Sequence, residues 1–209
     1  MMYRTKSLQF NFLMNSILTL SSIIFPLITF PYVSRILLPE GVGKVSLATS
    51  VVSYFSLIAQ LGIPTYGIRV CAKVRDNKEE LVSCTQELLI INIIMSVISY
   101  IGYFSMVFLI DKLANEKCLY IVMSTTILLN SIGIEWLYKG LEQYTYITIR
   151  SIAFKILALI ALFLFVHQRS DYVLYGAISV LAASLSNVLN FINARKYIFQ
   201  RSYRKLQFR

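Results

Sequence analysis

Six apolar stretches, each close to 20 residues long, recur along the chain between short connections that hold most of its charge. A stretch of about 20 apolar residues is long enough to cross a bilayer as a helix. Charged residues make up only 14% of the chain, against about 25% in ordinary globular domains, which is too few to cover a soluble surface. The pattern predicts an all-α, polytopic membrane protein with six transmembrane helices. We expect one bundle over residues 1–194, with spans at about 10–32, 45–63, 88–110, 118–138, 146–166 and 172–192, and a basic tail at 195–209.

The orientation follows from where the basic residues lie. Fourteen of the twenty Lys and Arg residues fall in the two termini and in the second and fourth connections, and only five fall in the other connections. Because basic residues are retained on the cytoplasmic side of a membrane, both termini are predicted to be cytoplasmic. The net charge of +10 has the same explanation, so no nucleic-acid partner is expected. The basic tail is expected to contact anionic membrane lipid.

Several kinds of chemistry find no support in the sequence. Cys71, Cys84 and Cys118 have neither metal-ligand spacing nor a cluster with the lone His167, so neither a metal site nor a disulfide framework is predicted. The glycines of Gly41-Val-Gly-Lys44 lack the flanking residues of a phosphate-binding loop. We therefore expect no cofactor and no enzymatic activity.

The segment from Thr29 to Ser46 lies between the first two apolar stretches and holds two prolines, two glycines and Arg35. Proline breaks or kinks a helix, and glycine permits a tight turn. The first helix is therefore predicted to end here and to turn into the second. The charge distribution then places Arg35 at the outer end of the first helix.

Polar side chains recur at helical spacing within most of the spans, so that each set falls on one face. Two interpretations are open: such residues hold membrane helices together, or they line a wet pathway. Because ionisable residues accompany them, the second interpretation is favoured. The predicted pathway residues are Asn11, Asn15, Ser53, Gln60, Asn92, Asn187 and Asn190.

The ionisable residues inside the spans are the strongest functional candidates, since each costs about 2.5–3.5 kcal/mol at a helix centre. Glu135 and Lys139 lie four residues apart and are expected to pair, either as a functional group or as a structural interfacial pair. Arg69 is either a functional cation or a marker of the cytoplasmic side. Arg150 is expected to extend to the cytoplasmic surface, whereas Lys155 lies deeper and is harder to explain in that way.

Four motifs together resemble a known family. They are Phe25–Ser46 (FPLITFPYVSRILLPEGVGKVS), Leu61–Arg69 (LGIPTYGIR), Gly133–Tyr144 (GIEWLYKGLEQY) and Tyr146–Ser151 (YITIRS). The chain is similar to the N-terminal lobe of bacterial polysaccharide transporters. These are the O-antigen and capsule repeat-unit flippases of the multidrug/oligosaccharidyl-lipid/polysaccharide exporter superfamily. One position departs from the family pattern, because Leu38 stands where the family usually has glycine.

The resemblance implies a transporter of the bacterial cytoplasmic membrane that flips undecaprenyl-pyrophosphate-linked oligosaccharide for lipopolysaccharide or capsule biosynthesis. It implies alternating access between two lobes of a 12–14-helix protein, so a second six-helix lobe or a homodimer is the expected partner. By position in the motifs, Arg35, Arg69 and Glu135 are carried over as cavity or gate groups. Two alternatives remain open: a small-molecule antiporter of the same superfamily, and a remnant or scaffold that does not transport.

Overall fold

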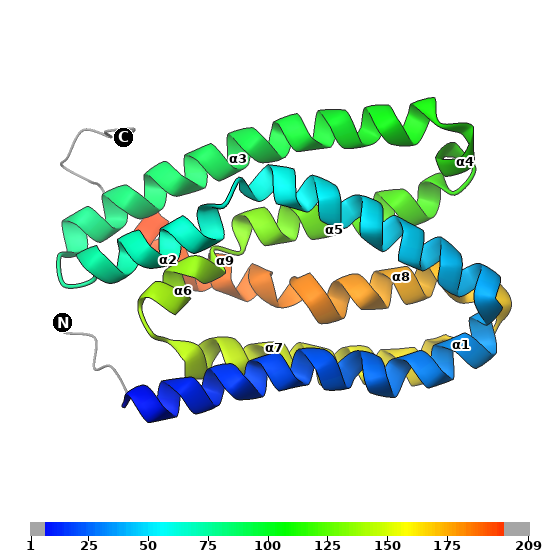
Figure 1. The fold of residues 1–209 in the computed structure, drawn as a ribbon, viewed down its shortest axis with the longest axis horizontal. Helices are drawn as coiled ribbons and strands as arrows, with labels where there is room; N and C mark the ends of the chain where they lie inside the picture. The colour runs from blue at the N-terminus through cyan, green and yellow to red at the C-terminus, as the bar shows by residue number, and fades with distance from the viewer. Residues whose placement is uncertain (1–6, 199–209) are drawn as a thin grey trace.

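The computed structural model describes residues 7–198, and every regular element in that range is helical (Figure 1). Five segments are long and apolar enough to cross a membrane. The chain is thus an all-α, multi-pass membrane protein, as the sequence predicts. The elements are α1 (Leu8–Gln60), α2 (Ile63–Val74), α3 (Lys78–Leu109), α4 (Asp111–Ala114), α5 (Lys117–Ile132), α6 (Glu135–Gly140), α7 (Tyr144–Phe165), η1 (Arg169–Asp171), α8 (Tyr172–Val180), η2 (Leu181–Leu185) and α9 (Ser186–Ile198).

Helix α1 reverses direction at Leu38, whose φ of 57° and ψ of 174° are not helical. We call residues 8–37 the first arm and residues 39–60 the second arm; the second returns toward the end of the bundle where the first began (Figure 1). The residue before a proline is disfavoured in the α region, and proline suits the first position of a helix, so Pro39 helps to place the reversal. The turn lies within the predicted segment, but the first arm continues to Leu37, beyond the expected end at residue 32.

Two further breaks separate short helices from the second and fourth expected spans. Leu61 and Gly62 are left-handed before α2, and Ile134 is left-handed before α6. Helices α2 and α6 then pack closely at one end of the bundle, because glycines remove side chains at the contact. A Cβ at Gly67 would lie 2.7 Å from the Trp136 ring, a distance that a packed interior does not tolerate.

Helix α3 begins at Lys78, ahead of the membrane span that is expected from residue 88. The Asn77 side chain caps this start by accepting hydrogen bonds from the backbone N–H groups of Glu79 and Glu80. The acids in the first turn also favour a helix start. The segment expected as the sixth span consists of α8, the π-helical η2 and α9.

Three clusters of buried apolar side chains hold the helices together. The first, which includes Tyr103 and Ile127, joins the second arm of α1 to α3, α5 and α8. The second surrounds Leu137 at the α2–α6 end, and the third joins the first arm to α7 through Val33 and Leu162. Many other apolar side chains, such as Leu20, Ile101 and Leu164, are exposed. A bilayer would solvate this outer surface.

Hydrogen bonds between α3 and its neighbours add polar contacts to this packing. The Asn92 side-chain amide donates to the backbone oxygen of Ser131, with 2.7 Å between the two atoms. The Ser99 hydroxyl donates to the backbone oxygen of Phe55 at 2.6 Å. Such contacts hold helices together in a membrane, where no water competes for them.

Candidate functional site

The site is built around Glu135, the first residue of α6. The break at Ile134 ends the preceding helical stretch and starts a new turn, so that Glu135 and Lys139 lie on one face of a short helix. Lys139 Nζ lies 2.8 Å from Glu135 Oε1. The salt bridge predicted from their spacing is therefore present.

Arg150 of α7 approaches the other oxygen of the same carboxylate. Its Nη2 lies 3.8 Å from Glu135 Oε2, and only 4% of its side chain is exposed. The guanidinium carbon also lies 5.8 Å from the centroid of the Tyr146 ring, within the range of a cation–π interaction. The expectation that Arg150 extends to the membrane surface is wrong, because the side chain turns inward to the acid that α6 presents.

The three charged groups do not balance. One carboxylate, Glu135, serves two cations, Lys139 and Arg150, so the cluster holds one excess positive charge. Within the described residues, Arg150 Nε and Nη1 are buried and have no hydrogen-bond partner. A buried charge with unused donors is unfavourable, and in membrane proteins such groups mark substrate or ion pathways. This excess makes the cluster suited to an anionic ligand.

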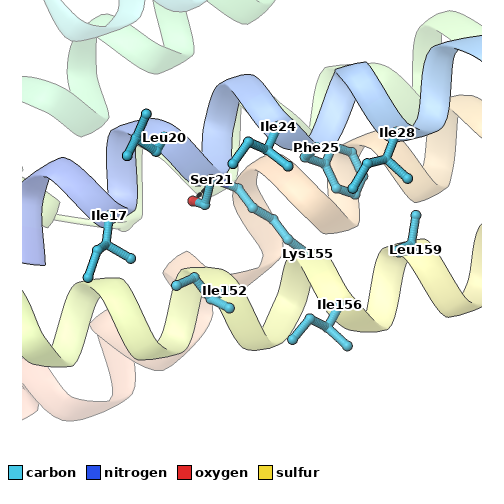
Figure 2. A pocket seen from close by; sticks show the side chains of 10 residues that line it. All are labelled: Ile17, Leu20, Ser21, Ile24, Phe25, Ile28, Ile152, Lys155, Ile156 and Leu159. Atoms are coloured by element: carbon cyan, nitrogen blue, oxygen red, sulfur yellow. Dashed lines mark hydrogen bonds between the residues drawn. The ribbon is translucent and has the colours of Figure 1, made fainter.

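Lys155 lies one and a half turns beyond Arg150 on α7 and forms a separate contact with α1. Its Nζ donates to the hydroxyl oxygens of Ser21 and Ser22, at 2.8 Å each. Figure 2 shows the side chain crossing from α7 to the first arm beside a pocket of about 350 Å³. The pocket is lined by Ile17, Leu20, Ser21, Ile24, Phe25, Ile28, Ile152, Lys155, Ile156 and Leu159.

Arg35 and Arg69, the other cations predicted to act in gating, stand apart from this cluster. Arg69 is exposed on α2, which packs against α6. Arg35 is exposed on the first arm just before the reversal at Leu38, and this reversal lies at the end of the bundle opposite α2 and α6 (Figure 1). The structure thus brings Glu135, Lys139 and Arg150 together, but it does not add Arg35 to them.

The predicted pathway residues differ in their surroundings. Asn15 and Ser53 are exposed, and Gln60 is half-buried. Four asparagines are buried: Asn11, Asn92, Asn187 and Asn190. Two of these belong to contacts between helices, because Asn92 bonds to α5 and Asn187 donates to the Asn130 side chain at 3.1 Å.

A second charged cluster, at the end of the bundle where α1 reverses, was not singled out from the sequence. Lys44 Nζ lies 2.8 Å from Glu116 Oε1 and 3.2 Å from Glu40 Oε1. The Tyr172 hydroxyl donates to Glu116 Oε2 at 2.7 Å. Burial raises the pKa of the Glu116 carboxyl, but the hydrogen bonds from Lys44 and Tyr172 outweigh it, so the pKa lies below its usual value.

Across residues 7–198, no group of three His, Cys, Asp or Glu side chains is placed to hold a metal ion.

Membrane-spanning helices with ionisable side chains turned into the bundle define a polytopic membrane protein. The model of the polysaccharide biosynthesis protein family matches residues 8–208, and the chain belongs to that family.

One curated relative extends this assignment. The chain is 25% identical over 183 residues to a candidate O-antigen transporter of Escherichia coli (strain K12). The match covers 88% of this chain and 44% of the relative, so the chain spans less than half of that protein's length. No solved structure matches the chain.

Proposed function

We propose that the chain takes part in flipping undecaprenyl-pyrophosphate-linked oligosaccharide across the bacterial cytoplasmic membrane, for surface polysaccharide biosynthesis. The observation that carries the proposal is the excess positive charge of the cluster formed by Glu135, Lys139 and Arg150. Family membership and the relative described as a candidate O-antigen transporter support it. A pyrophosphate is the kind of ligand that guanidinium and ammonium groups bind.

The proposal assigns a specific task to Arg150. A pyrophosphate would compete with Glu135 for the guanidinium, and its oxygens would also accept hydrogen bonds from Nε and Nη1, the two nitrogens that have no partner among the described residues. Glu135 would keep Lys139, its partner on the same helix. The carboxylate would thus hold Arg150 in place between transport events and release it when an anion arrives.

In this proposal the chain crosses the membrane six times, with both termini in the cytoplasm. The two arms of α1 would count as two passes, because α1 reverses at Leu38. The start of α1 and the end of α9 lie at the same end of the bundle, which supports an even number of passes (Figure 1). The bias of Lys and Arg toward the same side of the membrane is consistent with this orientation.

Alternating access requires two halves that move relative to each other. We propose that the surface of this six-helix unit works against a second six-helix lobe or a second copy of the chain. Arg35 and Arg69 are exposed, so each would be free to contact such a partner as a gate residue.

The test is deletion of the gene in its own host, followed by return of the intact chain on a plasmid. Surface polysaccharide is measured on stained gels, and lipid-linked repeat units are measured in membrane extracts. We expect the deletion to remove the polymer and to raise the amount of lipid-linked units, and the returned chain to reverse both changes.

Two other outcomes would contradict the proposal. Unchanged polymer with altered tolerance of cationic drugs would favour the small-molecule antiporter. If polymer, lipid-linked units and drug tolerance all stay unchanged, transport is excluded and the scaffold interpretation remains.

A further inference from the structure

The pocket between the first arm of α1 and α7 is an elongated apolar groove. On α1 its lining runs from Ile17 to Ile28, about 16 Å of helix at 1.5 Å per residue. On α7 it runs from Ile152 to Leu159, and the volume is about 350 Å³. A long, narrow space lined by branched aliphatic side chains fits a hydrocarbon chain.

Two polar side chains border this apolar lining, those of Ser21 and Lys155 (Figure 2). Lysine has three N–H donors, and two of them are given to the hydroxyls of Ser21 and Ser22. The salt bridges of the described residues do not include Lys155. The groove therefore combines an apolar channel with a cation that forms no salt bridge among the described residues.

The depth of Lys155 restricts what can compensate it. Lys155 lies near the middle of α7 (Tyr144–Phe165), about 16 Å of helix from either end. A helix of this length matches the hydrocarbon core of a bilayer, which is about 30 Å thick. The phosphate of a resident phospholipid stays at the interface and would not reach this depth, whereas the phosphate of a lipid in transit passes it.

We propose that this groove holds the hydrocarbon chain of the lipid carrier whose oligosaccharide is translocated, with Lys155 contacting the carrier's phosphate at mid-membrane. This inference rests on the proposed function. Arg150 and Lys155 lie five residues apart on the same helix, about 7.5 Å along its axis, so a phosphate leaving the Glu135 cluster would pass around α7 to reach Lys155. The serine hydroxyls hold the ammonium beside the groove, and the third N–H is available to the ligand.

The inference is tested by native mass spectrometry of the purified full chain in detergent. The probes are a polyprenyl diphosphate and the neutral polyprenol of the same chain length. We expect Lys155→Met to weaken diphosphate binding about tenfold or more, because a charge-assisted hydrogen bond is lost. Polyprenol binding should not change, and Lys155→Arg should retain most of the affinity for the diphosphate.

A second pair of variants tests the groove itself. Ile24 lines the pocket and is 49% exposed, whereas its neighbour Ile23 does not line it and is 55% exposed. Ile24→Trp should fill the groove and weaken both probes, and Ile23→Trp, the matched control, should weaken neither. Circular dichroism checks that each variant keeps its helix content; if Lys155→Met does not, Lys155→Arg and the tryptophan pair decide the result.

Three results would overturn the inference: wild-type diphosphate binding by Lys155→Met, equal losses in the two tryptophan variants, or displacement of the diphosphate by an equal concentration of phosphatidylglycerol. The gene-deletion experiment separates these from failure of the proposed function. If polymer production depends on the gene but binding of the probes does not depend on Lys155 or on the groove, only the groove inference fails. If binding of the probes depends on Lys155 and on the groove but polymer production does not depend on the gene, the proposed translocation fails and the lipid-binding site remains supported.

Discussion

The two ends of the bundle each hold a cluster in which a lysine pairs with glutamate, but the two clusters balance charge in opposite ways. In the cluster at the α6 end, Lys139 and Arg150 share Glu135, so cations exceed acids by one within the cluster. In the cluster at the end where α1 reverses, Lys44 is shared by Glu40 and Glu116, so acids exceed cations by one within the cluster. Tyr172 supports the second cluster by donating a hydrogen bond to Glu116.

Burial decides what each imbalance means. The Arg150 side chain is 4% exposed and has two donors without partners in the part of the chain that the structure describes. Glu40 is 83% exposed, so water can solvate its charge. The cluster of Lys44, Glu116 and Tyr172 therefore has a structural role, because it links α1, the start of α5 and α8. The cluster around Glu135 carries a charge that the protein itself does not neutralise.

The largest effect on stability is expected from Glu135→Gln, which would leave Arg150 buried without an acid. The free energy of unfolding should fall by about 1–3 kcal/mol, between the values for exposed and fully buried ion pairs, because Arg150 is buried but Glu135 is 35% exposed. Adding Arg150→Met in the same chain should recover most of this loss. Denaturant titration in mixed micelles, followed by circular dichroism, measures both variants. A double variant as unstable as Glu135→Gln would show that Arg150 is not the cause.

A smaller effect, in this case a gain in the free energy of unfolding, is expected from Leu38→Gly at the reversal of α1. Leu38 has a φ of 57° and a ψ of 174°, a region almost restricted to glycine that costs about 1–3 kcal/mol for other residues. After the greater entropy of glycine in the unfolded chain is subtracted, the net gain should be about 1 kcal/mol in the same titration. The neighbouring control, Leu37→Gly, should destabilise, because Leu37 is helical and buried. Destabilisation by both substitutions would contradict the claim that the backbone at Leu38 is strained.

The cluster of Lys44, Glu116 and Tyr172 should make a pH-dependent contribution of less than about 1 kcal/mol to the free energy of unfolding. The pKa of Glu116 is lowered in the folded chain, so its stabilisation is present above the unfolded value of about 4.3 and is lost as pH falls through the folded pKa. At pH 7 the wild type should melt above Glu116→Gln, and the difference should shrink as the pH falls below about 4.3 and vanish below the folded pKa of Glu116. If the difference in melting temperature grows on acidification, the sign of the predicted pH dependence is wrong.

The smallest effect concerns the asparagines. Asn92→Ala removes a hydrogen bond from α3 to α5 and should cost about 0.6 kcal/mol, the average for such contacts in membrane proteins. Asn15→Ala, at an exposed position of the first arm, should change stability little. Equal losses from the two variants would argue against a structural role specific to Asn92.

Features governed by local chemistry could be predicted from the sequence. The Asn77 cap depends on a side chain and backbone groups two and three residues away. The salt bridge of Glu135 and Lys139 depends on one turn of helix. The turn between Thr29 and Ser46 was predicted from its prolines and glycines, and it occurs at Leu38, the position where the family pattern has glycine.

The inward position of Arg150 could not be predicted in this way. A basic residue near the end of an apolar stretch looks the same whether it marks the cytoplasmic surface or faces the interior. The difference lies in the break at Ile134, which starts α6 and sets Glu135 opposite α7. Likewise, Glu116 and Lys44 are far apart in sequence, and only the packing of α1 against α5 brings them together.

The most direct test compares Arg150→Met with Lys44→Met in the complemented deletion strain, with membrane levels of both proteins measured by immunoblot. Surface polysaccharide should be lost with Arg150→Met at wild-type protein level and retained with Lys44→Met. Full polymer with Arg150→Met would contradict the claim that the uncompensated charge at the α6 end serves transport.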